Sequence, residues 1–290
     1  MKDADELLER LAIVHESEDQ AITQYNEARQ RLGAMPLSLV RTEQVYWLWQ
    51  RRIPYAKVTM IEGDPGIGKS TLTLMIAAAE SLGRGLPGES KRQPGRVLLV
   101  PAEDGLSDTV QPRLKKAGAD LCLIEAIEKP IRLDAAGCTL LHNYMTGFAP
   151  TLTIIDPLFA YVGAKDTNKQ GDARGIMDKL TRLAKRHNCA IVCVRHLNKG
   201  NRDKSIYRGG GSIDFTAAAR SVLLVGVDPS DNRRRAVVQI KNNLAPLAEP
   251  VGFTIEDGEF AWTEIGPDCR IDPCQRERCR KRTSWNQTSD

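Results

Sequence analysis

The 290-residue sequence has no apolar run long enough to cross a bilayer, and its first residues, MKDADELLER, are too charged for a signal peptide. It also has no strong excess of one charge. The formal net charge is +4, which permits nucleic-acid binding without arguing for it. We therefore expect a soluble cytoplasmic protein that makes no membrane contact. Its length allows one sizeable core with appendages, or two small domains.

The seven cysteines do not form an even, regularly spaced set, which argues against a disulfide framework and fits a reducing compartment. Cys189 and Cys193 fall in or beside an apolar run, where thiols are commonly buried. Cys269, Cys274 and Cys279 have no histidine nearby, so a solvated tail is favoured over a zinc site.

What the sequence does contain is Gly63-Asp64-Pro65-Gly66-Ile67-Gly68-Lys69-Ser70, followed by Thr71, which fits the phosphate-binding pattern G-x-x-x-x-G-K-[ST]. Its glycines let consecutive backbone N–H groups point inward and form a concave anion site. A helix that starts at about Lys69 adds its N-terminal partial positive charge. Lys69 is expected to reach the β- and γ-phosphates and Ser70 to coordinate Mg²⁺. Residues 63–71 thus predict binding of ATP with Mg²⁺.

Apolar runs that suit buried strands alternate with helical patterns along the chain. Strands are predicted at 58–62, 96–100, 152–156, 190–194, 221–225 and 236–240, and a hairpin with an Asp-Gly turn at 253–262. Helices are predicted after the phosphate loop and at 107–116, 133–144 and 176–187. This alternation indicates an α/β fold with a mainly parallel sheet covered by helices on both faces. Ligands then bind at the carboxyl ends of the strands.

Three regions are expected along the chain. Residues 1–35 carry apolar side chains three and four positions apart, which predicts an amphipathic helix or helical hairpin that packs on its own domain or on another protomer. Residues 36–266 form an ATPase domain, and 267–290 a polar, basic, disordered tail. Trp47 and Trp49 either line the edge of the core or stack on a nucleotide base.

Two acids follow predicted strands at the end where ligands bind. Asp156 closes an apolar strand, the position of an acid that orders Mg²⁺ through its water shell, although an aspartate there can also be a helix cap. Glu103 follows the neighbouring strand and could orient and deprotonate an attacking water. Asp104 is its competitor for that role, and a plain surface acid is the remaining alternative.

These features together resemble RecA-type core ATPases, and more narrowly the RepA-like hexameric replicative helicases of plasmids and phages, which are AAA family ATPases. The resemblance covers roughly residues 47–262. Besides the phosphate loop, it is carried by Pro101-Ala102-Glu103-Asp104, Pro112-Arg113-Leu114, Gly118-Ala119-Asp120, Ile154-Ile155-Asp156-Pro157, His196-Leu197-Asn198-Lys199, Arg208-Gly209-Gly210-Gly211-Ser212 and Ala219-Arg220-Ser221.

The resemblance implies further roles. His196 would be a sensor of the γ-phosphate, where a strand-end histidine read alone is more often structural. Arg220, Lys241 or Arg208 would be a catalytic finger supplied to a neighbouring subunit, or else a solvated surface charge. The segment from Lys199 to Gly211 would line a central channel. There, basic side chains would contact the backbone of single-stranded DNA without reading its sequence, and these are Lys199, Arg202, Lys204 and Arg208.

The sequence departs from DnaB-like helicases in three places: His196 replaces a glutamine, the N-terminal helices are not a DnaB-type primase-binding domain, and the tail carries no recognisable motif. We interpret the chain as an ATP-hydrolysing hexameric helicase or translocase on single-stranded DNA in plasmid or phage replication, with a primase or replication initiator as a further partner. One alternative is a RecA-like recombinase or regulatory ATPase that does not unwind DNA. A small-molecule kinase with the same phosphate loop is the third.

Overall fold

The structure, a computed structural model, describes residues 19–162, 170–197, 214–228 and 231–265. Contacts divide the chain into two units, Met1–Gln44 and Val45–Asp290. Within the first unit, residues 19–32 are helical and a 3-10 turn, η1, follows at Leu37–Leu39. The structure therefore describes only the second half of the predicted helical segment, and that half is helical. The first 18 residues and the predicted tail lie outside the described residues.

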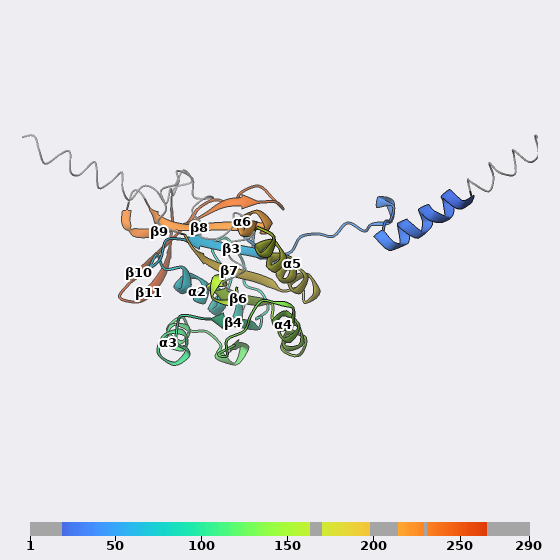
Figure 1. The fold of residues 1–290 in the computed structure, drawn as a ribbon. Helices are drawn as coiled ribbons and strands as arrows, with labels where there is room; N and C mark the ends of the chain where they lie inside the picture. The colour runs from blue at the N-terminus through green and yellow to red at the C-terminus, as the bar shows by residue number, and fades with distance from the viewer. Residues whose placement is uncertain (1–18, 163–169, 198–213, 229–230, 266–290) are drawn as a thin grey trace, which may run out of the picture. The chain divides into compact units, whose positions relative to one another are not determined.

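The second unit is built on a nine-stranded sheet (Figure 1). Six strands run parallel, and their order across the sheet is β8 (Ser221–Asp228), β3 (Val58–Gly63), β7 (Ala190–His196), β6 (Leu152–Asp156), β4 (Val97–Pro101) and β5 (Ile124–Ala126). Beyond β8 the sheet continues antiparallel with β9 (Asp231–Asn242), β10 (Val251–Glu256) and β11 (Glu259–Thr263). The predicted mainly parallel sheet is confirmed, with an antiparallel extension at its C-terminal side.

Helices cover both faces of this sheet, as predicted. One face packs against α2 (Lys69–Ser81) and α3 (Gln111–Lys116). The other packs against α4 (Ala135–Phe148), α5 (Gln170–Arg186) and α6 (Asp214–Ala218). Central strands such as β3 are buried along their whole length, because apolar side chains point into a core on each side.

The β10–β11 hairpin forms where the Asp-Gly turn was predicted. Asp257 and Gly258 both have positive φ, 49° and 73°, which is the conformation of the tight turn that matches the twist of a hairpin. A smaller hairpin, β1 (Trp47–Trp49) and β2 (Ile53–Pro54), leads into β3. Trp49 is fully buried and packs edge-on against Trp262, so it belongs to the core rather than to a base-stacking surface.

Several elements differ from their predicted bounds: β9 begins at Asp231, five residues before the predicted start, and α4 ends at Phe148, four residues after the predicted end. Helix α5 begins at Gln170, six residues before the predicted start. A π-helical turn, η2 (Leu106–Val110), precedes α3, and Pro112 lies in the first turn of α3, where its missing N–H costs little. Strand β5 and helix α6 were not predicted, because segments of three and five residues are too short to show a period. No helix in the described ranges could span a membrane.

Candidate nucleotide-binding site

The loop between β3 and α2 has the backbone shape that the phosphate-binding motif requires. Gly66 and Gly68 have φ values of 72° and 95°, which are favourable only for glycine. A Cβ atom at Gly68 would also lie 2.6 Å from Cδ1 of Ile255, so the β10–β11 hairpin packs directly on the loop. Arg235 on β9 donates to the carbonyl of Ile67 at 3.1 Å and ties the antiparallel strands to the same loop.

Lys69 lies inside the curve of this loop. Its Nζ donates to the carbonyls of Gly63 at 2.9 Å and Asp64 at 2.8 Å, and only 3% of the residue is exposed. Burial lowers the pKa of Lys69 to about 8, an effect that the carboxylate of Asp156 opposes. The loop therefore holds a cation that has been removed from water, and a bound polyphosphate would supply the missing counter-charge.

Asp156 ends β6 beside the phosphate loop. Burial raises its pKa to about 6, and this rise is opposed by a hydrogen bond from Ser70 and by the charge of Lys69. A buried carboxylate next to a hydroxyl is a donor set of hard oxygens, which is what Mg²⁺ prefers. The residues present therefore fit Mg²⁺, with Ser70 and Asp156 placed to hold it.

The two acids after β4 have different partners. Asp104 accepts a hydrogen bond from Arg113 of α3 at 3.2 Å and is held at the side of the cleft. Glu103 has a side chain that is 66% exposed, and its carboxylate lies 3.6 Å from Nε2 of His196 at the end of β7. Burial, and then the charge of Lys69, lower the pKa of His196. Both acids line the cleft, and Glu103 is the more exposed of the two and, among the described residues, the one without a guanidinium partner.

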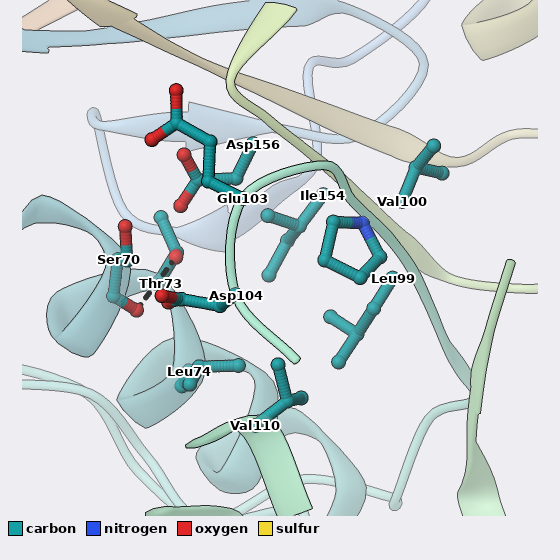
Figure 2. Close-up of a pocket in the computed structure, with 11 residues that line it drawn as sticks. Ser70, Thr73, Leu74, Leu99, Val100, Glu103, Asp104, Val110, Ile154 and Asp156 are labelled. Carbon is teal, nitrogen blue, oxygen red and sulfur yellow. Dashed lines mark hydrogen bonds between the residues drawn. The ribbon is translucent and has the colours of Figure 1, made fainter. Parts of the chain in front are cut away.

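Ser70, Glu103, Asp104 and Asp156 line one cleft at the carboxyl ends of the strands (Figure 2). Lys69 lies within reach of the charges of Asp156 and Glu103, and His196 contacts Glu103. Register pairs Pro101 with Asp156 and Gly63 with His196, which aligns the ends of β4 and β6 and those of β3 and β7. The figure shows the carboxylate of Asp156 toward the first turn of α2, where Ser70 lies, and the carboxylate of Glu103 beside that of Asp156. The tertiary structure thus brings together the phosphate loop, both predicted acids and His196, although the roles of these residues stay predictions.

A second cavity, of about 350 Å³, lies on the other side of α2 between α3 and the β10–β11 hairpin. Its apolar walls come from Met75, Ile255 and Phe260, and its polar rim includes Thr71 and Arg113. Flat apolar walls beside a guanidinium suit a heteroaromatic ring. This cavity was not predicted from the sequence, because the hairpin and α3 are about 140 residues apart in the chain and meet only in the fold.

Two of the three candidate finger residues, Arg220 and Lys241, are described, and they lie away from this chain's own phosphate loop. Arg220 is exposed, and its N–H donates to the carbonyl of Val58 at the opposite end of β3. Lys241 donates through Nζ to the carbonyls of Thr216, Ala217 and Ala219 at the C-terminal end of α6. The side chain of Lys241 therefore has partners within its own chain. Arg220 is exposed and is the better placed of the two to reach a neighbouring subunit. The predicted DNA-contacting residues lie outside the described residues, and these are Lys199, Arg202, Lys204 and Arg208.

A comparison with protein families matches residues 27–202 to AAA_25, a family of AAA domains. The chain belongs to this AAA domain family. AAA domains of this P-loop type bind ATP, typically with Mg²⁺, and hydrolyse it, so the nucleotide chemistry predicted from residues 63–71 agrees with the family.

The AAA domain has relatives among curated proteins and solved structures. The DNA repair protein RadA of Helicobacter pylori, in strains J99 and 26695, is 30% identical to it over 193 residues, which are 66% of this chain and 38% of RadA. This chain thus aligns with less than half of that protein. A KaiC-like protein from the hyperthermophilic archaeon Pyrococcus horikoshii OT3 has a TM-score of 0.54 at 12% identity, over 73% of this chain and 91% of that one. The structural likeness shows a RecA-like fold.

Proposed function

We propose that the AAA domain is an ATP-driven motor, a RepA-like hexameric helicase or translocase that moves on single-stranded DNA in plasmid or phage replication. The observation that carries this proposal is the cleft lined by Ser70, Asp156 and Glu103, with Lys69 close to both acids and His196 in contact with Glu103. The strand that ends at His196 leads directly, in sequence, into the basic residues 199–208. A movement of His196 in response to the terminal phosphate would therefore be passed directly to a basic segment that is suited to bind DNA phosphates.

Within this proposal each side chain has a distinct task. The loop N–H groups and Lys69 bind the phosphates, and Ser70 and Asp156 hold Mg²⁺, which would neutralise charge on the phosphate oxygens. Glu103 orients and deprotonates the attacking water, since Asp104 is already paired with Arg113. The adenine base occupies the second cavity, against Ile255 and beside Arg113.

The site is completed in this proposal by a neighbouring subunit. Arg220 lies at the end of the sheet opposite its own phosphate loop, so it can act only on the nucleotide of another copy. A basic residue supplied in this way increases the rate in related phosphoryl-transfer enzymes by about 10³–10⁵-fold. The alternative is a DNA-dependent ATPase that does not unwind. The similarity to RadA, which is named as a DNA repair protein, favours this second candidate.

The test measures ATP turnover against protein concentration, with and without single-stranded DNA. We expect turnover per subunit to rise with both, and Lys69→Ala to abolish it. Sizing with a non-hydrolysable ATP analogue and an oligonucleotide then distinguishes ring, filament and monomer. A forked duplex separates helicase from repair-type ATPase, because only the helicase releases the displaced strand. If ATP turnover changes neither with single-stranded DNA nor with protein concentration, the proposal of a motor is wrong.

A further inference from the structure

Three buried side chains meet just beneath the nucleotide cleft, on the face of the sheet that α5 and α6 cover. Glu62 precedes the phosphate loop on β3, Arg195 precedes His196 on β7, and Thr216 lies on α6. Glu62 and Arg195 are register partners on neighbouring parallel strands, so their side chains point to the same face. Their exposed fractions are 0%, 0% and 4%.

Thr216 bridges this ion pair. Nη2 of Arg195 lies 2.6 Å from Oε1 of Glu62 and donates to the Thr216 hydroxyl at 2.6 Å. The same hydroxyl donates to Oε1 of Glu62 at 2.9 Å. One threonine oxygen thus joins α6 to both strands, next to the residues that surround the phosphate.

The network is only partly satisfied. Among the described residues, Oε2 of Glu62 and both Nε and Nη1 of Arg195 have no hydrogen-bond partner, although they are buried. A buried ion pair adds little stability over apolar side chains of the same size. Unused donors and acceptors allow the same groups to exchange partners without a new desolvation cost. These properties suit an ion pair that can adopt two alternative sets of hydrogen bonds better than one with a single fixed set.

Helix α6 has two further attachments to the site. Phe215 is fully buried and packs edge-on against Phe159, with ring centroids 5.3 Å apart. Phe159 belongs to the turn η4 (Leu158–Tyr161), which follows Asp156 directly. Lys241 binds the carbonyls at the other end of α6. Through Thr216 and Phe215, α6 contacts the ends of β3 and β7, which lead to the phosphate loop and His196, and the turn that follows Asp156.

We infer that Thr216 is a positioning residue that couples the nucleotide cleft to α6 through the Glu62–Arg195 pair. Occupancy of the cleft shifts the ends of β3 and β7, the pair changes its hydrogen bonds, and α6 follows because Thr216 is bonded to both partners. Since α6 is the first described element after the basic residues 199–208 in the sequence, this contact sets how strongly DNA stimulates hydrolysis. The part that concerns DNA rests on the proposed function.

The experiment compares Thr216→Val, which keeps the side-chain volume and the ion pair but removes the bridge, with Thr216→Ser, which keeps the hydroxyl. Thr59→Val is the matched control, because Thr59 lies on β3, is fully buried and has a hydroxyl without a hydrogen-bond partner among the described residues. We expect Thr216→Val to reduce the ratio of DNA-stimulated to basal turnover about five- to tenfold, the size of a typical coupling between sites. Basal turnover should stay unchanged, and both other variants should behave as wild type.

A second readout does not involve DNA. Amide exchange of the α6 peptide should respond to a non-hydrolysable ATP analogue in wild type and Thr216→Ser, but not in Thr216→Val, while the β10–β11 peptide responds in all three. An α6 response retained in Thr216→Val overturns the inference, as does an equal loss of basal and stimulated turnover. If wild type hydrolyses ATP without any stimulation by DNA, the proposed function fails, and the exchange experiment alone decides the coupling.

Discussion

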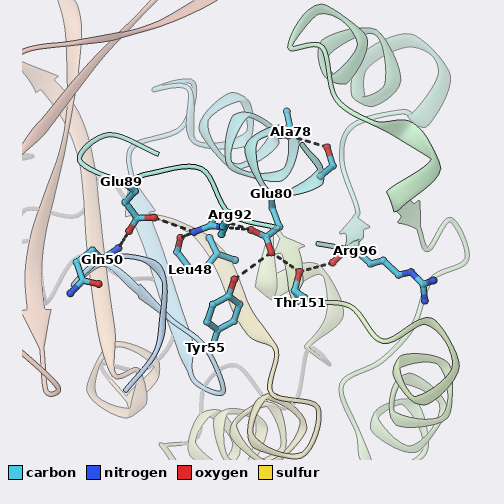
Figure 3. Close-up of polar contacts among 10 residues, drawn as sticks. Leu48, Gln50, Tyr55, Ala78, Glu80, Glu89, Arg92, Arg96 and Thr151 are labelled. Carbon is cyan, nitrogen blue, oxygen red and sulfur yellow. Dashed lines mark hydrogen bonds and ion pairs between the residues drawn. The ribbon is translucent and has the colours of Figure 1, made fainter. Parts of the chain in front are cut away.

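Buried carboxylates at the two ends of the central strands differ in how many of their oxygens have hydrogen-bond partners. At the amino end, Glu80 at the end of α2 is 1% exposed, and both of its carboxylate oxygens are occupied (Figure 3). Oε2 pairs with Arg92 at 2.8 Å, and Oε1 accepts hydrogen bonds from Thr151 at 2.6 Å and Tyr55 at 3.4 Å. At the carboxyl end, Glu62 is equally buried but has one oxygen without a hydrogen-bond partner among the described residues.

This difference separates a structural network from a functional one. The Glu80 network connects α2, the loop before β4 and the residue before β6, and both oxygens of its carboxylate have partners, although Nη2 of Arg92 faces Oε2 only as an ion pair and has no hydrogen bond among the described residues. At the carboxyl end, Lys69 and Asp156 have pKa values displaced by burial, and such displaced values cluster at functional sites. A substitution at the carboxyl end should therefore change activity more than stability, and one at the amino end the reverse.

The largest effect is expected at Glu103. Replacing it with glutamine should reduce ATP turnover by about 10²–10⁴-fold, the usual contribution of a general base, while nucleotide binding and thermal stability stay as in wild type. Asp104→Asn is the matched control, because its carboxylate is paired with Arg113 and should not carry the chemistry. Steady-state turnover and equilibrium nucleotide binding measure the two quantities. Normal hydrolysis by Glu103→Gln would move the role of the base to Asp104 or another acid.

The amino end should respond in the opposite manner. Arg92→Ala leaves the buried Glu80 carboxylate without its cation and should lower the free energy of unfolding by about 3 kcal/mol, the lower end of the usual cost, because Arg92 is 21% exposed. Arg84→Ala, in the same loop but exposed, should change stability by less than about 0.5 kcal/mol. Denaturant unfolding measures both. Equal stability of the two variants would show that the Glu80 network does not hold the fold together.

The smallest of the three effects is a gain in stability. Because the folded chain raises the pKa of Asp156 to about 6, the ionised carboxylate destabilises it above that pH, and below the ordinary value the penalty disappears. Without Mg²⁺ and nucleotide, Asp156→Asn should therefore be about 1–3 kcal/mol more stable than wild type at pH 7.5. The gain should fade between pH 6 and pH 4, as followed by thermal unfolding. A gain that is independent of pH would contradict this account.

Much of the fold followed from local patterns. The apolar runs of β3, β4, β6 and β7 and the Asp-Gly turn at 257–258 predicted strands and a hairpin where the structure has them. The phosphate loop was recognised because its function fixes backbone conformation at Gly66 and Gly68. Helix α6 and strand β5 were not predicted, since each is too short to carry a period and is held mainly by contacts with distant residues.

The candidate site was predicted in part for the same reason. Four site residues could be predicted from their positions in the sequence, because each lies at or just after the end of a strand or in the first turn of a helix. These are Lys69, Ser70, Glu103 and Asp156. The choice between Glu103 and Asp104 needed Arg113 and His196, whose side chains reach the two acids from other elements.

The sequence alone determined that the chain is an α/β phosphate-loop protein, since backbone conformation and the alternation of apolar runs are properties of neighbouring residues. Tertiary structure alone decided which groups meet across long separations: the second cavity between α3 and the hairpin, and the Thr216 bridge between Glu62 and Arg195. Such contacts depend on strand order and on which face of the sheet a side chain occupies. Neither is encoded within a single stretch of the chain.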